Sequence, residues 1–280
     1  MEQLGEGVPE GRWRNGDRVA ALATGGAYAE LCVVEEPCAM RLPPEMPLRL
    51  AASIPEAWLT AFQLLHLVGK VKQGDHVLVH AAANGVGLAA VQLAQEAGAI
   101  PIGTALGPKH GAVRERGVQH VVDYKAGPFV DAVKVATPEG RGVDLVLDCV
   151  GGGDYTRQNL ESLAAGGRLV VYGTMGGSVV PEFDLRVLMR KALTIRGSTL
   201  RARPFAYKAD LVARFWTPER FQVCERGVAE PNPQRVGPGQ RGPVPCDDGT
   251  EPKHRQNRGV RRSEPIINEL FEDERINPLK

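Results

Sequence analysis

A run of small residues near position 80 has the residue types and spacing best suited to ligand chemistry. The apolar residues 77–79 lead through alanines to Asn84, Gly85, Val86 and Gly87, where a helical pattern begins. Small side chains at a strand-to-helix turn let backbone amides approach a pyrophosphate, and the helix presents free N–H groups and its positive dipole end to that anion. A lone Gly-x-Gly also occurs in tight turns that bind nothing. Its place in a series of strand-helix units favours a dinucleotide site.

The next strand predicts which dinucleotide would bind. Sites for NAD place an Asp or Glu roughly 20 residues beyond the glycine loop, on the ribose 2′-hydroxyl. Here the segment after residues 99–105 has no acid and offers Lys109, whose charge suits a 2′-phosphate. Tyr124, after the third predicted strand, can add a hydroxyl to the same phosphate. Both residues also fit ordinary structural roles, as a solvated lysine and a packed tyrosine, but together they favour NADP(H).

Two further glycine turns follow later strands, at residues 148–152 and 172–177. Ligands of parallel sheets bind beyond the carboxyl ends of the strands, so both turns lie where a nicotinamide ribose would approach. Glycine after a strand is equally ordinary turn chemistry, and the sequence leaves both interpretations open. Cys149, in the first turn, has no basic neighbour in the sequence to lower its pKa and is interpreted as a small buried residue rather than a nucleophile.

The sequence lacks the motifs of metal-dependent enzymes, of serine hydrolases and of P-loop nucleotide-binding proteins. The six histidines form no H-x-x-x-H or H-E-x-x-H pair, and the five cysteines form no C-x-x-C pair, so we expect no metal site and no disulfide framework. There is no G-x-S-x-G elbow and no G-x-x-x-x-G-K-[ST] loop. The sequence assigns no catalytic side chain.

From residue 75 to about 215 the sequence repeats a short apolar run, a glycine turn and a helical pattern. This predicts an α/β fold with a doubly wound parallel sheet, because runs that are apolar throughout indicate strands covered on both faces. The helix 86–97 follows the first strand, and an apolar helix 51–68 precedes it. Residues 17–34 are predicted to form two short strands around Gly25 and Gly26, and residues 38–47 a proline-rich loop. The predicted strands of the sheet are 76–82, 99–105, 120–124, 143–150, 168–173 and 193–198.

Composition narrows the class of protein. Of 280 residues 43% are hydrophobic, and 34 Lys and Arg stand against 33 Asp and Glu, so no overall charge favours nucleic acid or membrane surfaces. No apolar stretch is long enough to span a bilayer, and we expect a cytoplasmic protein. Residues 216–280 are rich in Pro, Gly and Arg and predict a disordered tail. Its basic residues 253–262 fit a solvated tail better than an RNA site.

Several motifs carry a family resemblance that covers residues 16 to about 215. The sequence resembles the zinc-free quinone oxidoreductase branch of the medium-chain dehydrogenase/reductase superfamily. The segment ending in Phe62 is specific to that branch, whereas the glycine turns are shared by the whole superfamily. The matching segments are residues 16–19, 26–30, 52–62, 81–87 with 92–94, 148–152, 172–177 and 197–203.

The resemblance implies an NADPH-dependent reductase of quinones and conjugated carbonyls, with a homodimer joined through the Rossmann sheet. It implies a remnant of a GroES-like β domain at 1–57 and a Rossmann NADP-binding domain at 58–215. It places Thr60, Asn84, Gly85 and Val86 near the nicotinamide and pyrophosphate. Lys109 and Tyr124 would lie at the 2′-phosphate, and Met175 and Gly176 would line the nicotinamide side.

The sequence also departs from the family. Relatives carry earlier strands of the GroES-like domain and return to that domain after the position of Phe215, where this sequence continues into the Pro- and Arg-rich tail, like a frameshifted or alternatively spliced end. Asn84 stands where close relatives have Ser or Gly. The expectation is therefore a quinone reductase impaired by truncation. The alternative is a non-catalytic variant that binds NADPH and dimerises.

Overall fold

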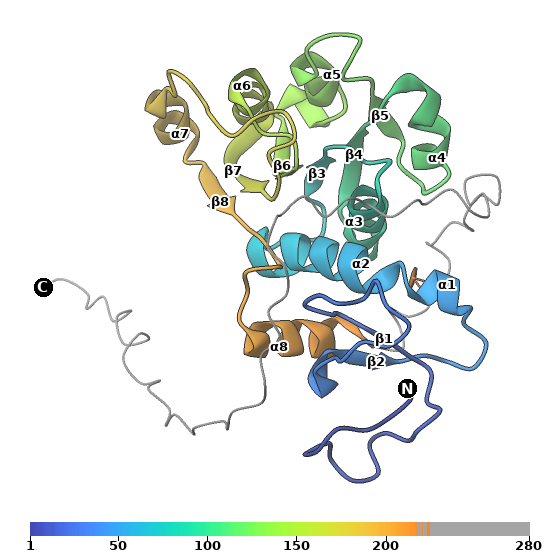
Figure 1. The fold of residues 1–280 in the computed structure, drawn as a ribbon. Helices are drawn as coiled ribbons and strands as arrows, with labels where there is room; N and C mark the ends of the chain where they lie inside the picture. The colour runs from blue at the N-terminus through green and yellow to red at the C-terminus, as the bar shows by residue number, and fades with distance from the viewer. Residues whose placement is uncertain (218–219, 221–222, 225–280) are drawn as a thin grey trace, which may run out of the picture. The chain divides into compact units, whose positions relative to one another are not determined.

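Six parallel strands form the centre of the protein. The computed structural model describes residues 1–217, 220, 223 and 224, which lie within one compact unit, Met1–Asn232. The sheet order is β5-β4-β3-β6-β7-β8 (Figure 1), so the chain runs outward from β3 to one edge and then returns to build the other. The predicted doubly wound fold is confirmed. The strands are β3 (His76–Val79), β4 (Ile100–Thr104), β5 (His120–Val122), β6 (Val143–Asp148), β7 (Leu163–Val171) and β8 (Thr194–Gly197).

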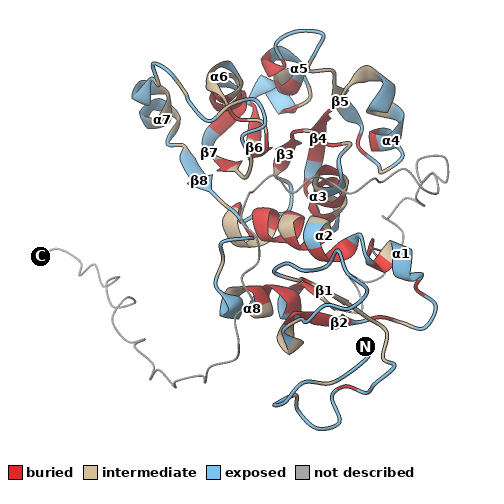
Figure 2. Cartoon of the chain, viewed as in Figure 1, coloured by how far each residue is buried: buried red, intermediate tan, exposed pale blue. Residues whose placement is uncertain are grey.

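Helices cover both faces of the sheet because successive side chains of each strand point to opposite sides. Val77 and Val79 pack into one hydrophobic cluster, with α2 and α3, while Leu78 packs into another, with α5 and α6. Figure 2 shows β3, β4 and β6 largely buried between these layers, whereas β8 at the sheet edge is exposed. The helices that follow the strands are α3 (Gly85–Glu96), α4 (His110–Arg114), α5 (Val130–Val135), α6 (Gly153–Ser162) and α7 (Leu185–Lys191), with short 3₁₀ helices at Gly107–Lys109 and Pro138–Gly140.

The predicted helix 51–68 is present as two consecutive pieces that begin at Ile54. A short α1 (Leu48–Ala51) precedes α2 (Ile54–Phe62), and the chain continues into a π-helical segment, Gln63–Val68. Pro55 lies in the first turn of α2, where its missing N–H costs no hydrogen bond. The buried face of α2 packs against α3 and against α8 (Phe205–Phe215), with the rings of Phe62 and Phe215 5.7 Å apart.

The prediction for residues 17–47 is wrong in its pairing. β1 (Val19–Ala21) does pair antiparallel, but its partner is β2 (Ala39–Arg41), within the expected loop, after a 3₁₀ turn at Glu36–Cys38. Burial explains the choice: Met40 is buried in β2, whereas Tyr28 and Val33, in the segment expected to pair, are fully exposed. Pairing of residues 39–41 removes apolar surface from water, and pairing of residues 23–34 would not.

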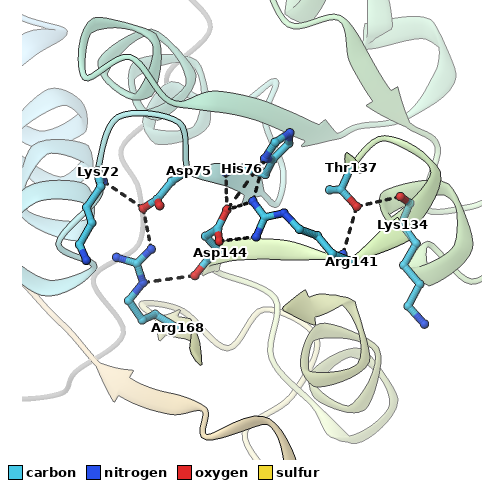
Figure 3. A network of polar contacts seen from close by, with 9 residues as sticks. Lys72, Asp75, His76, Lys134, Thr137, Arg141, Asp144 and Arg168 are labelled. Carbon is cyan, nitrogen blue, oxygen red and sulfur yellow. Dashed lines mark hydrogen bonds and ion pairs between the residues drawn. The ribbon is translucent and has the colours of Figure 1, made fainter. Parts of the chain in front are cut away.

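A charged network ties the strands together at the edge where they begin (Figure 3). Arg168 forms a 2.6 Å ion pair with Asp75, in which the two side chains are only 20% and 13% exposed. The same guanidinium donates to the carbonyls of residues 69 and 70 in the turn before β3 and to that of Asp144 in β6. This network joins β7, β6 and the start of β3.

Asp144 completes the network on the other side. It receives two hydrogen bonds of 2.8 Å from Arg141 and one of 2.8 Å from the backbone amide of His76. Although burial alone would raise the pKa of the Asp144 carboxyl, these partners hold the pKa below its usual value. The carboxylate is therefore ionised, and the beginnings of β3 and β6 are fixed side by side.

No helix among the described residues is long and apolar enough to cross a membrane. The predicted tail, 216–280, falls almost wholly outside the described residues. The predicted division into 1–57 and 58–215 lies inside one compact unit and stays a prediction.

Candidate functional site

The carboxyl ends of β3 and β6 lie next to each other in the sheet, although β3 is followed by β4 on one side and β6 by β7 on the other. The connections after these two strands therefore diverge at this edge of the sheet; we call this position the crevice, because ligands of doubly wound sheets bind at such a point of the strand order. The predicted site residues that follow strands all lie in the connections at this edge, either in loops or in the first turn of a helix. They come from the connections after β3, β4, β5 and β7.

Asn84 caps α3. Its Oδ1 accepts the backbone amide of Gly87 at 2.6 Å, which satisfies one of the helix amides that has no partner within the helix. The amides of Gly85 and Val86 precede the first bond of the helix, from the Leu88 amide to the Asn84 carbonyl at 2.8 Å. The larger amide in place of Ser or Gly thus performs the capping role and leaves the first two amides for an anion.

Gly87 lets the helix begin directly on the strand. A Cβ at this position would lie 2.4 Å from the carbonyl oxygen of Ala81 and 2.7 Å from the Cα of Ala82. Both contacts are with backbone atoms that cannot rotate away. The first turn of α3 therefore approaches the end of β3 more closely than any other residue would allow.

Thr60 belongs to α2, which packs against α3. A Cβ on Gly85 would be 3.7 Å from the Cβ of Ala57, so α2 passes over the first turn of α3. Thr60 is partly buried and lies one turn further along α2. The structure therefore places Thr60 and the glycine loop on neighbouring elements, and the role of Thr60 at a nicotinamide stays a prediction.

Lys109 and Tyr124 lie on adjacent loops beyond β4 and β5. The Ala105 amide donates to the Val122 carbonyl at 3.0 Å, which keeps the two strand ends together. Lys109 ends a short 3₁₀ turn and is exposed, whereas Tyr124 is partly buried. An exposed cation at this position can reach an anion beside β4.

Sequence reasoning missed an acid at the same place. Asp123 follows β5, and its Oδ2 accepts the amide of Gly107 at 3.0 Å while its Oδ1 accepts the amide of Lys125 at 2.9 Å. The Asp123 carboxylate thus lies against the connection after β4 that carries Lys109. The adjacency of β4 and β5 in a doubly wound sheet was the signal that would have found it.

Met175 and Gly176 belong to a turn that is bonded to the glycine turn after β6. The Met175 amide donates to the Cys149 carbonyl at 3.2 Å and the Gly176 amide to the Val150 carbonyl at 2.6 Å. A Cβ on Gly151 would lie 2.7 Å from the Gly177 carbonyl oxygen. These glycines have a packing role, and the Met175 side chain, 71% exposed, extends beyond them.

A buried polar cluster lies directly beneath these loops, and no sequence motif indicated it. His80 is fully buried, with its Nε2 2.6 Å from Asn159 Oδ1 and its Nδ1 3.0 Å from both Thr104 Oγ1 and the Tyr155 hydroxyl. Burial lowers the pKa of His80 and raises the pKa of the Tyr155 hydroxyl. Both side chains are therefore neutral near pH 7 and join β3, β4 and α6.

Asp148 connects this cluster to the loop above it. Its Oδ2 accepts the Asn159 side-chain amide at 3.0 Å, and its Oδ1 accepts the amides of Val150 and Gly151 at 2.7 and 3.0 Å. Cys149 beside it is buried, and burial raises the pKa of its thiol, which confirms its interpretation as a small buried residue. Among the described residues no three His, Cys, Asp or Glu side chains are grouped to hold a metal ion.

Comparison with known proteins agrees with this arrangement. Residues 85–215, from the start of α3 to the end of α8, match the family model described as zinc-binding dehydrogenase. The human synaptic vesicle membrane protein VAT-1 homolog is 37% identical over 188 residues, which are 67% of this chain and 47% of that protein. The chain thus spans about half the length of this curated relative.

Two solved structures have the same fold. The quinone oxidoreductase of Pseudomonas syringae has a TM-score of 0.70 and 31% identity, and the alignment covers 82% of this chain and 69% of that one. The mycobacterial protein Rv1454c, complexed with NADPH, also gives 0.70 and 31%, with 82% and 70% covered. The sheet order and the crevice define a Rossmann-type α/β protein. The chain belongs to the medium-chain dehydrogenase/reductase superfamily, a superfamily of oxidoreductases.

Proposed function

We propose that this chain is an NADPH-dependent reductase that transfers hydride to a quinone or a conjugated carbonyl compound. The observation that carries the proposal is the glycine loop at the crevice, where α3 begins against β3 and two helix amides precede the first helical bond. This cradle has the chemistry that a pyrophosphate requires. NADPH, when bound, supplies the hydride, and the similarity to a structure complexed with NADPH supports that choice.

In this proposal the side chains bind and orient rather than react. Gly85 and Val86 hold the pyrophosphate, and Lys109 and Tyr124 hold the 2′-phosphate. Thr60, Met175 and Gly176 position the nicotinamide and exclude water from it, because hydride transfer requires reacting atoms held at about 3–3.5 Å. No side chain is required as an acid at the crevice.

Further features belong to the same proposal. Within the superfamily we assign the chain to the branch of the p53-inducible quinone oxidoreductase, because its sequence motifs resemble that branch most. Residues 1–57 would belong to a GroES-like domain and 58–215 to the Rossmann domain. A homodimer would form through β8, whose four residues are exposed at the sheet edge.

Titration of NADPH and NADH tests the proposal, with nucleotide fluorescence as the readout. We expect NADPH to bind more tightly than NADH, and Lys109→Ala to weaken NADPH about tenfold with little effect on NADH, because a charge-assisted contact contributes about 1.5–3 kcal/mol. Lys72→Ala is the control, since it removes an exposed cation from the turn before β3, at the opposite edge of the sheet. Absence of binding, or equal preference for both nucleotides, would contradict the proposal. Binding without reduction of a simple quinone would instead favour the non-catalytic alternative.

A further inference from the structure

Four polar side chains beneath the crevice are completely buried: His80, Thr104, Asp148 and Asn159. None of them is assigned to the cofactor in the proposed function. A buried polar network in which every member has a partner rigidifies its surroundings and permits one arrangement of them. Since this network lies under two loops of the crevice, its contacts with those loops indicate what it positions.

The hydrogen bonds of this network all run toward Asp148. Because a carboxylate oxygen accepts, the Asn159 side chain donates its NH₂ group to Asp148 Oδ2 at 3.0 Å. Asn159 Oδ1 then accepts from His80 Nε2 at 2.6 Å. The neutral imidazole has its one proton on Nε2, so Nδ1 is an acceptor for the hydroxyls of Thr104 and Tyr155, both 3.0 Å away. Asp148 is the final acceptor of the network.

The second oxygen of Asp148 binds the turn that follows β6. Oδ1 accepts the backbone amides of Val150 and Gly151 at 2.7 and 3.0 Å. The carbonyl of Val150 in turn accepts the amide of Gly176 at 2.6 Å. The orientation of the turn after β6 therefore determines the position of the turn after β7, which carries Met175 and Gly176.

The network contacts the glycine loop after β3 less closely. Thr104 Oγ1 lies 3.3 Å from the Ala81 amide, which is longer than either bond that Asp148 accepts from the backbone. The first turn of α3 is stabilised by the Asn84 cap and by the close approach of Gly87 to β3. Loss of the Asp148 carboxylate should therefore disturb the turns after β6 and β7 and leave the glycine loop in place.

We propose that Asp148 is a positioning residue for the nicotinamide end of the cofactor, oriented by Asn159 and acting through the backbone of the turns after β6 and β7. This rests on the proposed function, in which Met175 and Gly176 position the nicotinamide. Asp148 makes no contact with the residues assigned to the 2′-phosphate among its hydrogen bonds. Its removal should therefore separate the two halves of the cofactor, with weaker binding of the nicotinamide half alone.

The test compares NADPH with adenosine 2′,5′-bisphosphate, which lacks the nicotinamide half, by calorimetry on the full chain. Asp148→Asn converts one acceptor oxygen into a donor, which must face either the two backbone amides or the amide of Asn159. We expect this variant to bind NADPH about tenfold more weakly, because hydrogen bonds to a charged group are lost. Affinity for the bisphosphate should change by less than about twofold.

Exchange of the two side-chain types provides the rescue. Asn159→Asp alone sets two buried carboxylates against each other and should also weaken NADPH. In the double variant the amide at position 148 accepts from the backbone and donates to the carboxylate at position 159, which accepts from His80 Nε2, so every bond can form again. The double variant should bind NADPH within about threefold of the parent's affinity.

Asp144→Asn is the matched control. Asp144 lies on the same strand, and its carboxylate also accepts a backbone amide, that of His76 at 2.8 Å, at the edge opposite the crevice (Figure 3). This variant should keep the parent's ratio of NADPH affinity to bisphosphate affinity. A ratio that fell as far as in Asp148→Asn would contradict a specific role of Asp148.

Two other results would overturn the assignment: an unchanged ratio of the two affinities in Asp148→Asn, or a double variant that binds NADPH no better than the single ones. If Asp148→Asn does not fold, Asn159→Ala decides, because it keeps the carboxylate and removes the donor that orients it. A loss of about threefold for NADPH alone is then expected, and no loss contradicts the proposal.

Failure of NADPH to bind the parent chain would refute the reductase. Hydrogen exchange of the amides of residues 150 and 151, measured without ligand, still decides whether Asp148 fixes their turn. We expect exchange to be faster in Asp148→Asn than in the parent and slow again in the double variant. Equal exchange in the parent and in Asp148→Asn would contradict the positioning role.

Discussion

Replacement of Gly87 by alanine tests the geometry on which the crevice depends. The added Cβ would lie 2.4, 2.7 and 2.9 Å from three backbone atoms of residues 81 and 82. A carbon atom needs about 3.5 Å from such atoms, so α3 would have to move by about 1 Å. Overpacking of a tight site costs about 1–3 kcal/mol, and three backbone contacts place Gly87→Ala near the upper value.

Thermal unfolding followed by circular dichroism measures this cost. A loss of about 3 kcal/mol lowers the Tm of a domain of this size by about 6–12 °C. Gly111→Ala is the matched control: no atom lies within 4 Å of its added Cβ, and alanine is the better helix former, so the Tm should stay equal or rise slightly. A Gly87→Ala variant with a Tm within 2 °C of the parent would refute the close approach of α3 to β3.

Three further substitutions follow from described contacts. Asn84→Ala should cost about 1 kcal/mol of unfolding free energy in chemical denaturation, because it removes the cap of α3. Arg168→Met should cost about 3 kcal/mol and leave NADPH affinity unchanged, because it leaves the largely buried Asp75 carboxylate without its ion-pair partner at the edge opposite the crevice. Burial lowers the pKa of His66 in the folded protein from 6.5 to about 4. Between pH 6.5 and pH 4 this histidine is therefore protonated in the unfolded chain but neutral in the folded protein. Stability should therefore fall as the pH falls from 6.5 to 4, and less steeply in His66→Gln.

Each of these three predictions is checked against its own comparison. Asn84→Asp keeps an oxygen that can cap the helix and should retain the parent's stability. Arg186→Met breaks an exposed ion pair with Asp184 and should cost less than about 0.5 kcal/mol, in contrast to Arg168→Met. A pH profile of stability identical in the parent and His66→Gln would contradict the assignment of that slope to His66.

The sheet and its crevice were predictable because their signals are local. Continuous apolar runs indicated strands covered on both faces, and Gly85 and Gly87 after β3 indicated where α3 begins. The first helix of the sheet begins and ends within one residue of its prediction. Among the strands of the sheet, β7 is the one whose start differs most from its prediction: it begins at Leu163 rather than near Arg168. Glycines in residues 163–167 interrupt the apolar run, so the sequence pattern did not show this part of the strand.

Features that depend on long-range contact were not predictable in the same way. β2 was missed because the choice between residues 23–34 and 39–41 as partner of β1 depends on which side chains find a core. Asn159 lies mid-helix, and nothing nearby in the sequence shows that it joins His80 to Asp148. Asp123 contacts Gly107 only because β4 and β5, which are 16 residues apart at this point, pair in the sheet. In each case the partner is chosen by the fold and not by the neighbouring residues.

The charged network around Arg168 and Asp144 has a consequence for how this protein can diverge. Its guanidinium and carboxylate groups join the strands at the edge where they begin. The glycine loops lie at the opposite edge, about the length of a strand away. Substitutions in the glycine loops therefore leave the charged network intact. Substitutions in the charged network leave the ligand-binding groups of the loops unchanged. Ligand preference in such a chain is free to drift between descendants while the scaffold stays folded, with selection acting on the two ends separately.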